Sequence, residues 1–340
     1  MSKKVSSTDV ARRAGVSRAT VSYVLAGRTD LAIREVTRQK VFDAAEVLGY
    51  RPNLAARALV TGQTYMIALW VPYAYHIVFS NVIEHIMRLA QGSRFQVTIV
   101  QTYGETGETL TSGGLLSDWH VDGILAFDAK HLVEEVLGQH SHVMPIVSFG
   151  PAATQTTDNV GVDLYEGSLQ ALRHLEEIGC RRIAYVVGQN HFRVGEPRYD
   201  AYIQVMQEKG MEPLVIRLTR DGYNDAYQTV RHYFATQNRV DGLFCWNDET
   251  AIGANRALAD LGLRVPEDVA LIGVDGIEET IFSVPTLSTV AQPFEEMCRL
   301  AWDFLQQRLK DPSLPLQQIN LSMRLEKRAS TNRVDHERSA

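Results

Sequence analysis

Residues 7–25 read STDVARRAGVSRATVSYVL, and this stretch decides the fold with which the chain begins. Ser6 or Ser7 can accept hydrogen bonds from the first N–H groups of a helix, as N-cap residues do. Gly15 is suited to end that helix, because the residue after a helix often adopts a positive φ. Ser17 can then cap a second helix at once. Two short helices joined by a glycine turn predict a helix-turn-helix.

Apolar residues recur at helical spacing in both helices and in a third helix expected over about 34–48. Small and branched side chains on these faces would let the three helices cross closely. The inward-facing residues are expected to be Val10, Ala11, Ala14, Val21, Val24, Leu25, Val36, Val41, Ala44, Ala45 and Leu48.

The outward face of the second helix is the expected site of DNA reading, because a recognition helix enters the major groove. Arg18 can form paired hydrogen bonds to a guanine, Ala19 can touch a thymine methyl group, and Tyr23 can reach a base or a phosphate. For any single arginine, a solvated surface charge is the alternative. The candidates in this region are Ser7, Ser17, Arg18, Ala19, Thr20, Ser22, Tyr23, Arg28, Thr37 and Arg38.

The distribution of charge supports a nucleic-acid partner. The whole chain carries a net charge of −6, but residues 1–60 contain 11 Lys or Arg against 5 Asp or Glu, which is a net of +6. The remaining residues therefore carry −12. A basic region on an acidic body indicates that this region meets a polyanion.

Other features exclude several classes of protein. The sequence has no apolar run long enough to span a bilayer, and no apolar stretch follows its first lysines, so we expect a cytoplasmic protein. Three cysteines without zinc spacing fit a reducing compartment, where they would be free thiols. There is no GxSxG, phosphate-loop or HExxH motif, and the ten histidines show no metal spacing. We therefore expect no enzyme activity, no metal and no cofactor.

The N-terminal stretch VSSTDVARRAGVSRATVSYVLAGRTDLAIREVTRQKVFDAAEVLGYRPNLAARAL (5–59) resembles the DNA-binding domain of the LacI–GalR family of bacterial transcription regulators. The similarity covers about 60 residues, and the body continues it to RLEKRAST, which ends at Thr331. Two positions depart from the family pattern. Arg34 stands where a Ser or Thr usually caps the third helix, and Ala26 replaces an Asn, which leaves one backbone contact in doubt.

The resemblance implies that residues 51–63 contain a hinge, which becomes helical only on operator DNA. Paired hinge helices would enter the minor groove, where Leu59 would wedge between base pairs and bend the duplex. The helix-forming residues of this segment are consistent with such a hinge, since a helix this short has only marginal stability on its own. Val60 stands where relatives often carry a base-reading Lys, so that contact is expected to be missing. The alternative is that Leu59 packs on the body. The hinge candidates are Asn53, Ala56, Arg57 and Leu59.

From residue 64 onward, short apolar runs alternate with helical stretches, which predicts doubly wound parallel sheets. Strands are expected at 65–71, 95–101, 122–127, 145–149, 181–188, 213–218, 241–246 and 268–276, with a helix at 79–91. Two successive sets predict two lobes, and the resemblance implies a body similar to periplasmic sugar-binding proteins with crossovers near 161, 291 and 323. The first lobe would comprise 64–161 and 292–322, the second 162–291 and 323–331, and a polar tail 332–340.

Ligands of such folds bind at the carboxyl ends of the strands, so candidates for an effector site can be chosen there. Arg198 could hold a hydroxyl or carboxylate with its planar fork, and Trp246 could stack on C–H groups. The alternatives are core packing for Trp246 and a structural ion pair for Arg198 and Asp275. Tyr73 and His76 replace a carboxylate-bearing family element, and Ala201 replaces a family Gly beside Arg198. The candidates are Tyr73, His76, Phe79, Asp128, Phe149, Arg198, Tyr223, Trp246, Asn247 and Asp275.

Together these features predict an allosteric repressor of carbohydrate-utilisation genes. A homodimer would bind a near-palindromic operator, and a small ligand between the lobes, expected to be a sugar, would change the spacing of the hinges. Induction and co-repression both fit, as do a nucleoside or a protein as effector. The competing classes are a periplasmic carrier, which the basic head disfavours, and an enzyme, which the missing motifs disfavour.

Overall fold

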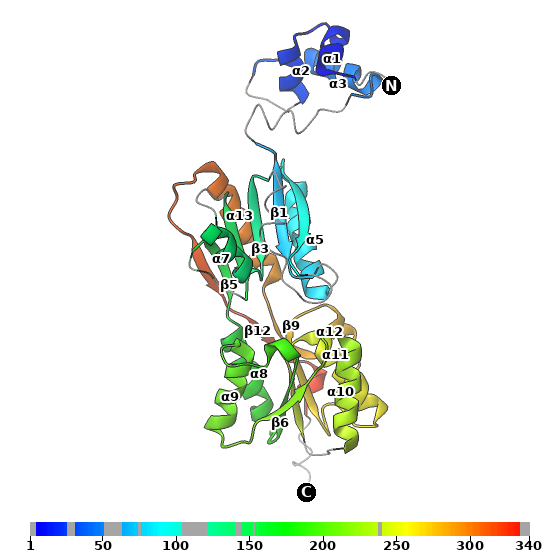
Figure 1. Cartoon of the computed structure of the whole chain (residues 1–340). Coiled ribbons are helices and arrows are strands. Elements are labelled where there is room, and N and C mark those ends of the chain that lie inside the picture. Colours follow the sequence, from blue (N-terminus) through cyan, green and yellow to red (C-terminus); the bar gives the residue numbers. More distant parts are fainter. Residues whose placement is uncertain are drawn as a thin grey trace. The chain divides into compact units, whose positions relative to one another are not determined.

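The chain divides into two compact units, Met1–Tyr65 and Met66–Ala340 (Figure 1). The computed structural model describes residues 5–25, 31–50, 63–73, 76–103, 121–139, 144–151, 154, 156–236 and 240–333. The expected hinge, with Asn53, Ala56, Arg57 and Leu59, lies outside the described residues, as do Arg28 and residues 334–340.

The N-terminal unit contains three helices, α1 (Ser7–Ala14), α2 (Arg18–Leu25) and α3 (Glu35–Val47). The Asp9 carboxylate accepts a hydrogen bond from the Ser6 N–H at 3.0 Å, which satisfies a donor at the start of α1. Gly15 ends the helix with φ at 68°. The predicted helix-turn-helix is therefore confirmed.

The core of this unit contains most of the residues predicted from helical spacing, with one exception. Val10, Val21 and Val41 are fully buried where the three helices meet, and Ala44 and Ala45 pack with them. Val36 is 68% exposed, so the prediction that it faces inward is wrong. At about 100° per residue, Val36 lies some 140° around α3 from Val41, on the opposite side of the helix from the buried stripe.

The larger unit contains two six-stranded sheets. The first has the order β11-β5-β4-β3-β1-β2, and all of its strands are parallel. Its strands are β1 (Met66–Val71), β2 (Gln96–Gln101), β3 (Gly123–Phe127), β4 (Ile146–Gly150), β5 (Asp158–Val162) and β11 (Gln318–Leu321). Helix α7 (Lys130–Gln139) covers one face through an apolar cluster, and α13 (Phe294–Lys310) covers the other beside α5 (Ile77–Gln91).

The second sheet has the order β12-β10-β9-β8-β6-β7, with only β12 antiparallel. Its strands are β6 (Ile183–Val187), β7 (Leu214–Arg217), β8 (Gly242–Cys245), β9 (Ala270–Asp275), β10 (Ser288–Ala291) and β12 (Arg324–Glu326). Helices α8 (Leu164–Glu177) and α9 (Pro197–Glu208) pack together, as do α10 (Tyr223–Thr236) and α11 (Asp248–Asp260). A short α12 (Glu279–Phe282) follows β9, and 3₁₀ turns lie at Gln189–His191 and Ala329–Thr331.

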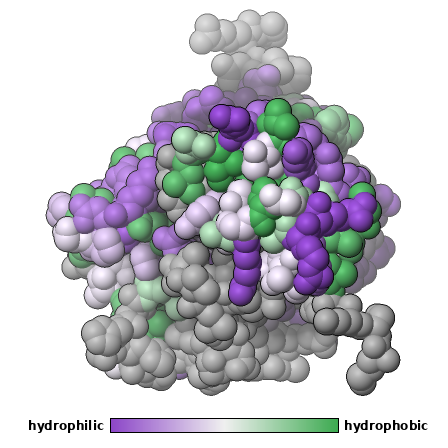
Figure 2. Space-filling model, turned by 90° about the horizontal axis from the view of Figure 1, so that it is seen from above, coloured by the Kyte–Doolittle hydropathy of each residue, from purple (hydrophilic) through white to green (hydrophobic). Residues whose placement is uncertain are grey.

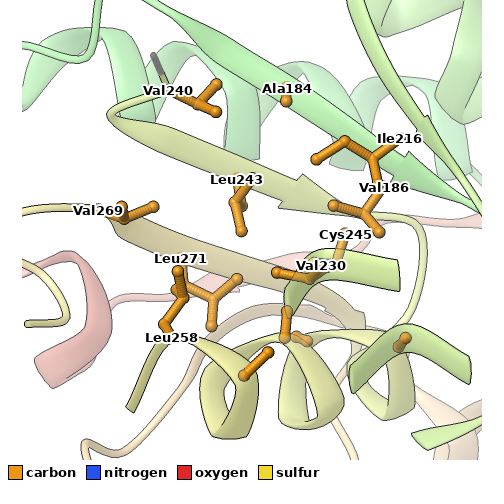
Figure 3. Close-up of a cluster of buried hydrophobic side chains, with 14 of the residues drawn as sticks. Ala184, Val186, Ile216, Val230, Val240, Leu243, Cys245, Leu258, Val269 and Leu271 are labelled. Atoms are coloured by element: carbon orange, nitrogen blue, oxygen red, sulfur yellow. The ribbon is translucent and has the colours of Figure 1, made fainter. Parts of the chain in front are cut away.

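The core between the second sheet and helices α10 and α11 is strongly apolar. Leu243 and Cys245 from β8 and Leu271 from β9 are fully buried against Val230 and Leu258 from the two helices (Figure 3). Burying an aliphatic side chain of this size contributes about 1.5–3 kcal/mol. This cluster fixes the second sheet, and with it the position of the polar residues at its carboxyl edge.

The chain passes between the two sheets three times. It leaves the first sheet after β5, returns after β10 through α13, and leaves again between β11 and β12. The doubly wound parallel architecture that was predicted is confirmed. Within the described residues, no helix is both long and apolar enough to cross a membrane.

Candidate functional site

The first candidate site is the outward face of α2. Ser17, Arg18, Ala19, Ser22 and Tyr23 are all exposed. The Ser17 hydroxyl accepts a hydrogen bond from the Thr20 N–H at 3.0 Å, so this serine caps the helix as predicted. The polar side chains of α2 therefore point away from a core that already holds the helix in place.

Neighbouring helices add further polar groups to this unit. Ser7 at the start of α1 and Thr37 in α3 are half-buried, and the Arg38 guanidinium donates to the Leu31 carbonyl at 3.5 Å. Large apolar residues are exposed here too, namely Tyr23, Val36, Phe42 and Val47. Figure 2, a view from above, shows hydrophilic and hydrophobic residues intermixed among the coloured residues of this one face.

The second candidate site lies at the carboxyl ends of the strands in the larger unit. Asp128 follows β3 of the first sheet, while Trp246 follows β8 and Asp275 ends β9 of the second. Arg198 lies in the first turn of α9. The parallel strands of a sheet end at one edge, which brings these residues to the two facing edges where ligands of such folds bind.

Arg198 is the centre of this cluster. It is 8% exposed, its Nε donates to Glu196 Oε1 at 2.8 Å, and its Nη1 donates to the Trp246 carbonyl at 2.9 Å. Its guanidinium carbon lies 5.0 Å from the centroid of the Trp246 ring. Burial would lower the pKa of Arg198, but Glu196, Tyr185 and Asp275 outweigh it and raise that pKa above its usual value. The guanidinium is therefore charged and held in one orientation.

Trp246 has a stacking partner that the sequence pattern did not identify. The His191 ring lies parallel to it, with 4.2 Å between centroids and 22° between planes. Burial, with Arg198 and Arg193, lowers the pKa of His191 to about 3, so this imidazole is neutral at physiological pH. The Trp246 Nε1 atom is buried and has no hydrogen-bond partner among the described residues. A buried donor of this kind favours a ligand that offers an acceptor.

Two aspartates carry charges that their surroundings only partly neutralise. Asp275 accepts a hydrogen bond from Gln292 Nε2 at 2.7 Å, and burial raises its pKa to about 7. Burial also raises the pKa of Asp128 to about 6; Arg198 lowers that pKa and Glu196 raises it. Asp128 belongs to the first sheet and Arg198 to the layer of the second, so the site has groups from both.

A direct contact also joins the two lobes. His76 Nδ1 lies 3.4 Å from Glu249 Oε2, and the Ile77 N–H donates to Glu249 Oε1 at 3.3 Å. Glu249 is 6% exposed in the first turn of α11, while His76 precedes α5. Sequence reasoning missed Glu249, although it follows Trp246 and Asn247 at the same strand end. It also missed Glu196, Gln292 and His191.

The remaining candidates in the first lobe form an aromatic group, and those in the second lobe lie at the starts of helices. Tyr73 stacks on Tyr103 with 5.5 Å between centroids, and Phe79 lies 6.3 Å from Tyr73. Phe149 is fully buried and packs behind Phe127 at 5.1 Å, so it supports the aromatic group from within the core.

Tyr223, at the start of α10, is 37% exposed. Asn247 Oδ1 accepts a hydrogen bond from the Thr250 N–H at 2.9 Å and thereby caps α11. In the part of the chain that the structure describes, no group of three or more His, Cys, Asp or Glu side chains is placed to hold a metal ion.

Comparison with known proteins finds similarity in both parts of the chain. Residues 8–53 match the family model described as bacterial regulatory proteins, lacI family, and residues 172–331 match a periplasmic binding protein-like domain. The HTH-type transcriptional repressor PurR of Edwardsiella ictaluri (strain 93-146) is 28% identical over 327 residues, which is 95% of each chain.

Solved structures of similar architecture cover nearly the whole chain. The lac repressor dimer bound to operator and the anti-inducer ONPF has a TM-score of 0.78 and 24% identity, covering 97% of this chain and 99% of that one. At that identity the likeness shows the fold. The transcriptional regulator CelR in complex with cellobiose has a TM-score of 0.66 and 26% identity, covering 96% of this chain and 100% of that one.

Proposed function

The chain belongs to the lacI family of bacterial regulatory proteins, and on this premise we propose that it represses carbohydrate-utilisation genes under the control of a sugar. It is a DNA-binding repressor with a ligand-regulated effector domain, and the family is not enzymatic. The proposal concerns which ligand it binds, which residues bind the ligand and the DNA, and how the two are coupled. Residues 1–50 would bind DNA, 51–63 would form the hinge, and 64–340 would bind effector and dimerise.

For DNA, we assign base reading to the exposed face of α2. Arg18 has the fork geometry for guanine, and Ala19 and Tyr23 are also exposed on this helix. Ser7, Ser17, Thr37 and Arg38 would contact phosphates and set the position of α2. Two copies of the chain would read the two half-sites of a near-palindromic operator, as expected for a helix-turn-helix dimer.

For the effector, the observation that carries the proposal is the cluster of polar and aromatic groups contributed by both sheets. Arg198 is fixed by Glu196 and by the Trp246 carbonyl, so binding a hydroxyl would cost it little conformational entropy. Trp246 is 8% exposed, and His191 and Arg198 already contact its ring, so it would offer a sugar its Nε1 donor and the remaining part of the ring. The proposed contacts are Tyr73, His76, Phe79, Asp128, Arg198, Tyr223, Trp246, Asn247 and Asp275, with Phe149 behind them.

Effector binding would be coupled to operator binding if the effector binds two arrangements of the lobes with unequal affinity. The contacts of Glu249 with His76 and Ile77 hold one such arrangement, since they join α11 to the start of α5. A ligand that binds Asp128 and Asp275 together favours the arrangement in which both are in reach. The resulting movement of the first lobe would change the distance between the two hinges of a dimer, and with it operator affinity.

The test is operator binding measured together with ligand binding. A palindromic duplex should bind in a gel shift, and its affinity should fall steeply as salt increases, because phosphate contacts release counterions. A sugar that raises the melting temperature by mass action should also change operator affinity. Absence of binding to any genomic fragment at low salt would contradict the DNA assignment.

A nucleoside is the second candidate ligand. The stacked Tyr73 and Tyr103 rings and the His191 ring, which packs on Trp246, are half-buried and offer flat surfaces that suit an aromatic base. If a nucleoside raises the melting temperature and no sugar does, the carbohydrate assignment is wrong while the regulator assignment stands. The sign of the change in operator affinity then separates induction from co-repression.

A further inference from the structure

The charges around the candidate effector site do not balance. Arg198 is the buried cation of the cluster, and Glu196 already neutralises it at 2.8 Å. Glu196 also accepts from the Tyr199 N–H at 2.9 Å, so both of its oxygens are engaged within α9. Asp128 and Asp275 therefore face a site whose buried cation is already paired.

Other carboxylates around the site differ in whether their oxygens accept hydrogen bonds from the protein. The Asp248 Oδ2 atom accepts hydrogen bonds from the Gly276 and Ile277 N–H groups in the loop after β9, at 2.7 and 3.0 Å, whereas its Oδ1 atom is buried without a partner among the described residues. Glu249 has the contacts with His76 and Ile77.

Asp221 interacts electrostatically with His76, Glu249 and Arg198 from the exposed end of the loop before α10. Among the described residues, neither Asp221 nor Asp128 has a side-chain hydrogen bond.

Hydrogen-bond acceptors also exceed donors. Gln292 is 8% exposed, its Nε2 atom donates to Asp275, and its Oε1 atom is buried without a donor in the described part of the chain. Asp128 likewise lacks a donor. On the donor side, the Trp246 Nε1 atom and the hydroxyl groups of Tyr185 and Thr250 are buried without a partner among the described residues. A ligand that fits this set brings several N–H donors and a positive charge at one position and hydroxyl oxygens at another.

We propose that the effector carries a positively charged amino group beside its hydroxyl groups, and that the Asp128 and Asp275 carboxylates bind this amino group. The inference rests on the proposed function and specifies its ligand. An ammonium group has three donors and forms charge-assisted hydrogen bonds with two carboxylates. A metal ion is a poorer occupant, since the described residues place no group of three or more His, Cys, Asp or Glu side chains to hold one.

The protonation of the two aspartates supports this assignment. Burial raises the pKa of Asp128 to about 6 and that of Asp275 to about 7, and the opposing effect of Arg198 on both carboxyl groups does not cancel it. A bound ammonium supplies a further positive charge and favours both ionised forms. Affinity for an amine should therefore weaken as pH falls below these values and the carboxylates become protonated, while affinity for a neutral sugar should change much less.

Matched sugars provide the test on the full chain. Glucose, glucosamine and N-acetylglucosamine share one ring, and only glucosamine carries a charge; galactose and mannose offer the same three forms. Calorimetry should show one amino sugar binding about 10-fold tighter than its neutral partners, as expected for a charge-assisted contact. If no amino sugar binds more tightly than its neutral partners, the proposal is overturned, whether or not neutral sugars bind.

A pair of variants then locates the contact. Asp128→Asn keeps the shape and removes the charge, and it should reduce amine affinity about 10-fold while changing that of the neutral partner less than about 2-fold. Glu267→Gln, an exposed residue before β9 at the opposite edge of the sheet, removes the same charge and should change neither. Equal losses for amine and neutral sugar in Asp128→Asn would overturn the assignment.

Operator binding separates this inference from the function on which it rests. If the gel shift succeeds and amino sugars show no preference, only the ligand class is wrong. Failure of the gel shift contradicts the regulator assignment itself, independently of any sugar result. A normal circular dichroism spectrum and melting temperature show that Asp128→Asn has folded.

Discussion

The exposed face of α2 and the buried cluster around Arg198 use polar side chains in opposite ways. Arg18 and Tyr23 are exposed, and an apolar core beneath them holds their helix. Arg198 is buried and held by Glu196 and the Trp246 carbonyl. A duplex is large and brings its own charge, so the surface that reads it can stay open. A small ligand cannot organise its site, so the protein has to orient the binding groups beforehand.

The strongest test of this difference is Arg198→Ala. The change leaves the buried Glu196 without its cation, and breaking a buried ion pair costs about 3–5 kcal/mol. Chemical denaturation should show the larger unit destabilised by that amount, and effector binding should be lost. Operator binding without effector should persist under conditions where the protein remains folded. Stability equal to wild type would show that the cluster is not preorganised.

Arg18→Ala should have the next largest effect, on the other side of the comparison. Loss of paired hydrogen bonds to a base costs about 1–3 kcal/mol, so operator affinity should fall about 10- to 100-fold while both melting temperature and effector affinity stay unchanged. Arg256→Ala, an exposed arginine of α11, is the matched control and should leave operator affinity unaltered. A loss that is equal for specific and random duplexes would reassign Arg18 to phosphate contact.

Leu59→Ala tests the hinge. If Leu59 wedges between base pairs, the variant should keep its fold and its effector affinity and bind the operator several-fold more weakly, because less bending is stabilised. Circular dichroism on addition of operator should also show a smaller gain in helix. Unchanged operator affinity would mean that Leu59 packs on the body. Since Val60 follows it, discrimination between related operators should change little.

The smallest effect should come from Val36→Ala in α3. Val36 is 68% exposed, so unfolding of the N-terminal unit should change by less than about 0.5 kcal/mol. Val41→Ala on the buried side of the same helix should cost about 2 kcal/mol, through lost burial and a residual cavity. Equal effects in the two variants would contradict the assignment of the buried face.

Local patterns explain which features could be predicted from the sequence. Gly15 and Ser17 encode the helix-turn-helix because capping and turn chemistry act within a few residues. The strands β5 and β11 were not predicted, since DNVGV and QINL lack long apolar runs. They form as partners in register, Asn159 opposite Gln318, through chain segments about 160 residues apart. Strand pairing of that kind is only weakly indicated by the sequence of either segment alone.

The candidate effector site shows the same limit. Trp246 and Asp275 could be chosen because each ends a recognisable strand. His191 and Gln292 could not, because their roles depend on what lies beside them, which are the Trp246 ring and the Asp275 carboxylate. Motif reasoning finds residues at strand ends. It does not find the neighbours that set their charge and orientation, and in the proposed effector site those neighbours would determine which ligand fits.

The three crossovers between the sheets have a consequence for how such a protein can be rearranged. Residues up to about 65 form one continuous unit, so a single recombination junction would exchange it for another DNA-binding domain. Neither lobe is continuous, because β11 and β12 return to separate sheets after residue 310. A premature stop codon there would remove an edge strand from both lobes at once. Recombination can therefore replace the DNA specificity of this chain in one step, whereas its effector body is inherited whole.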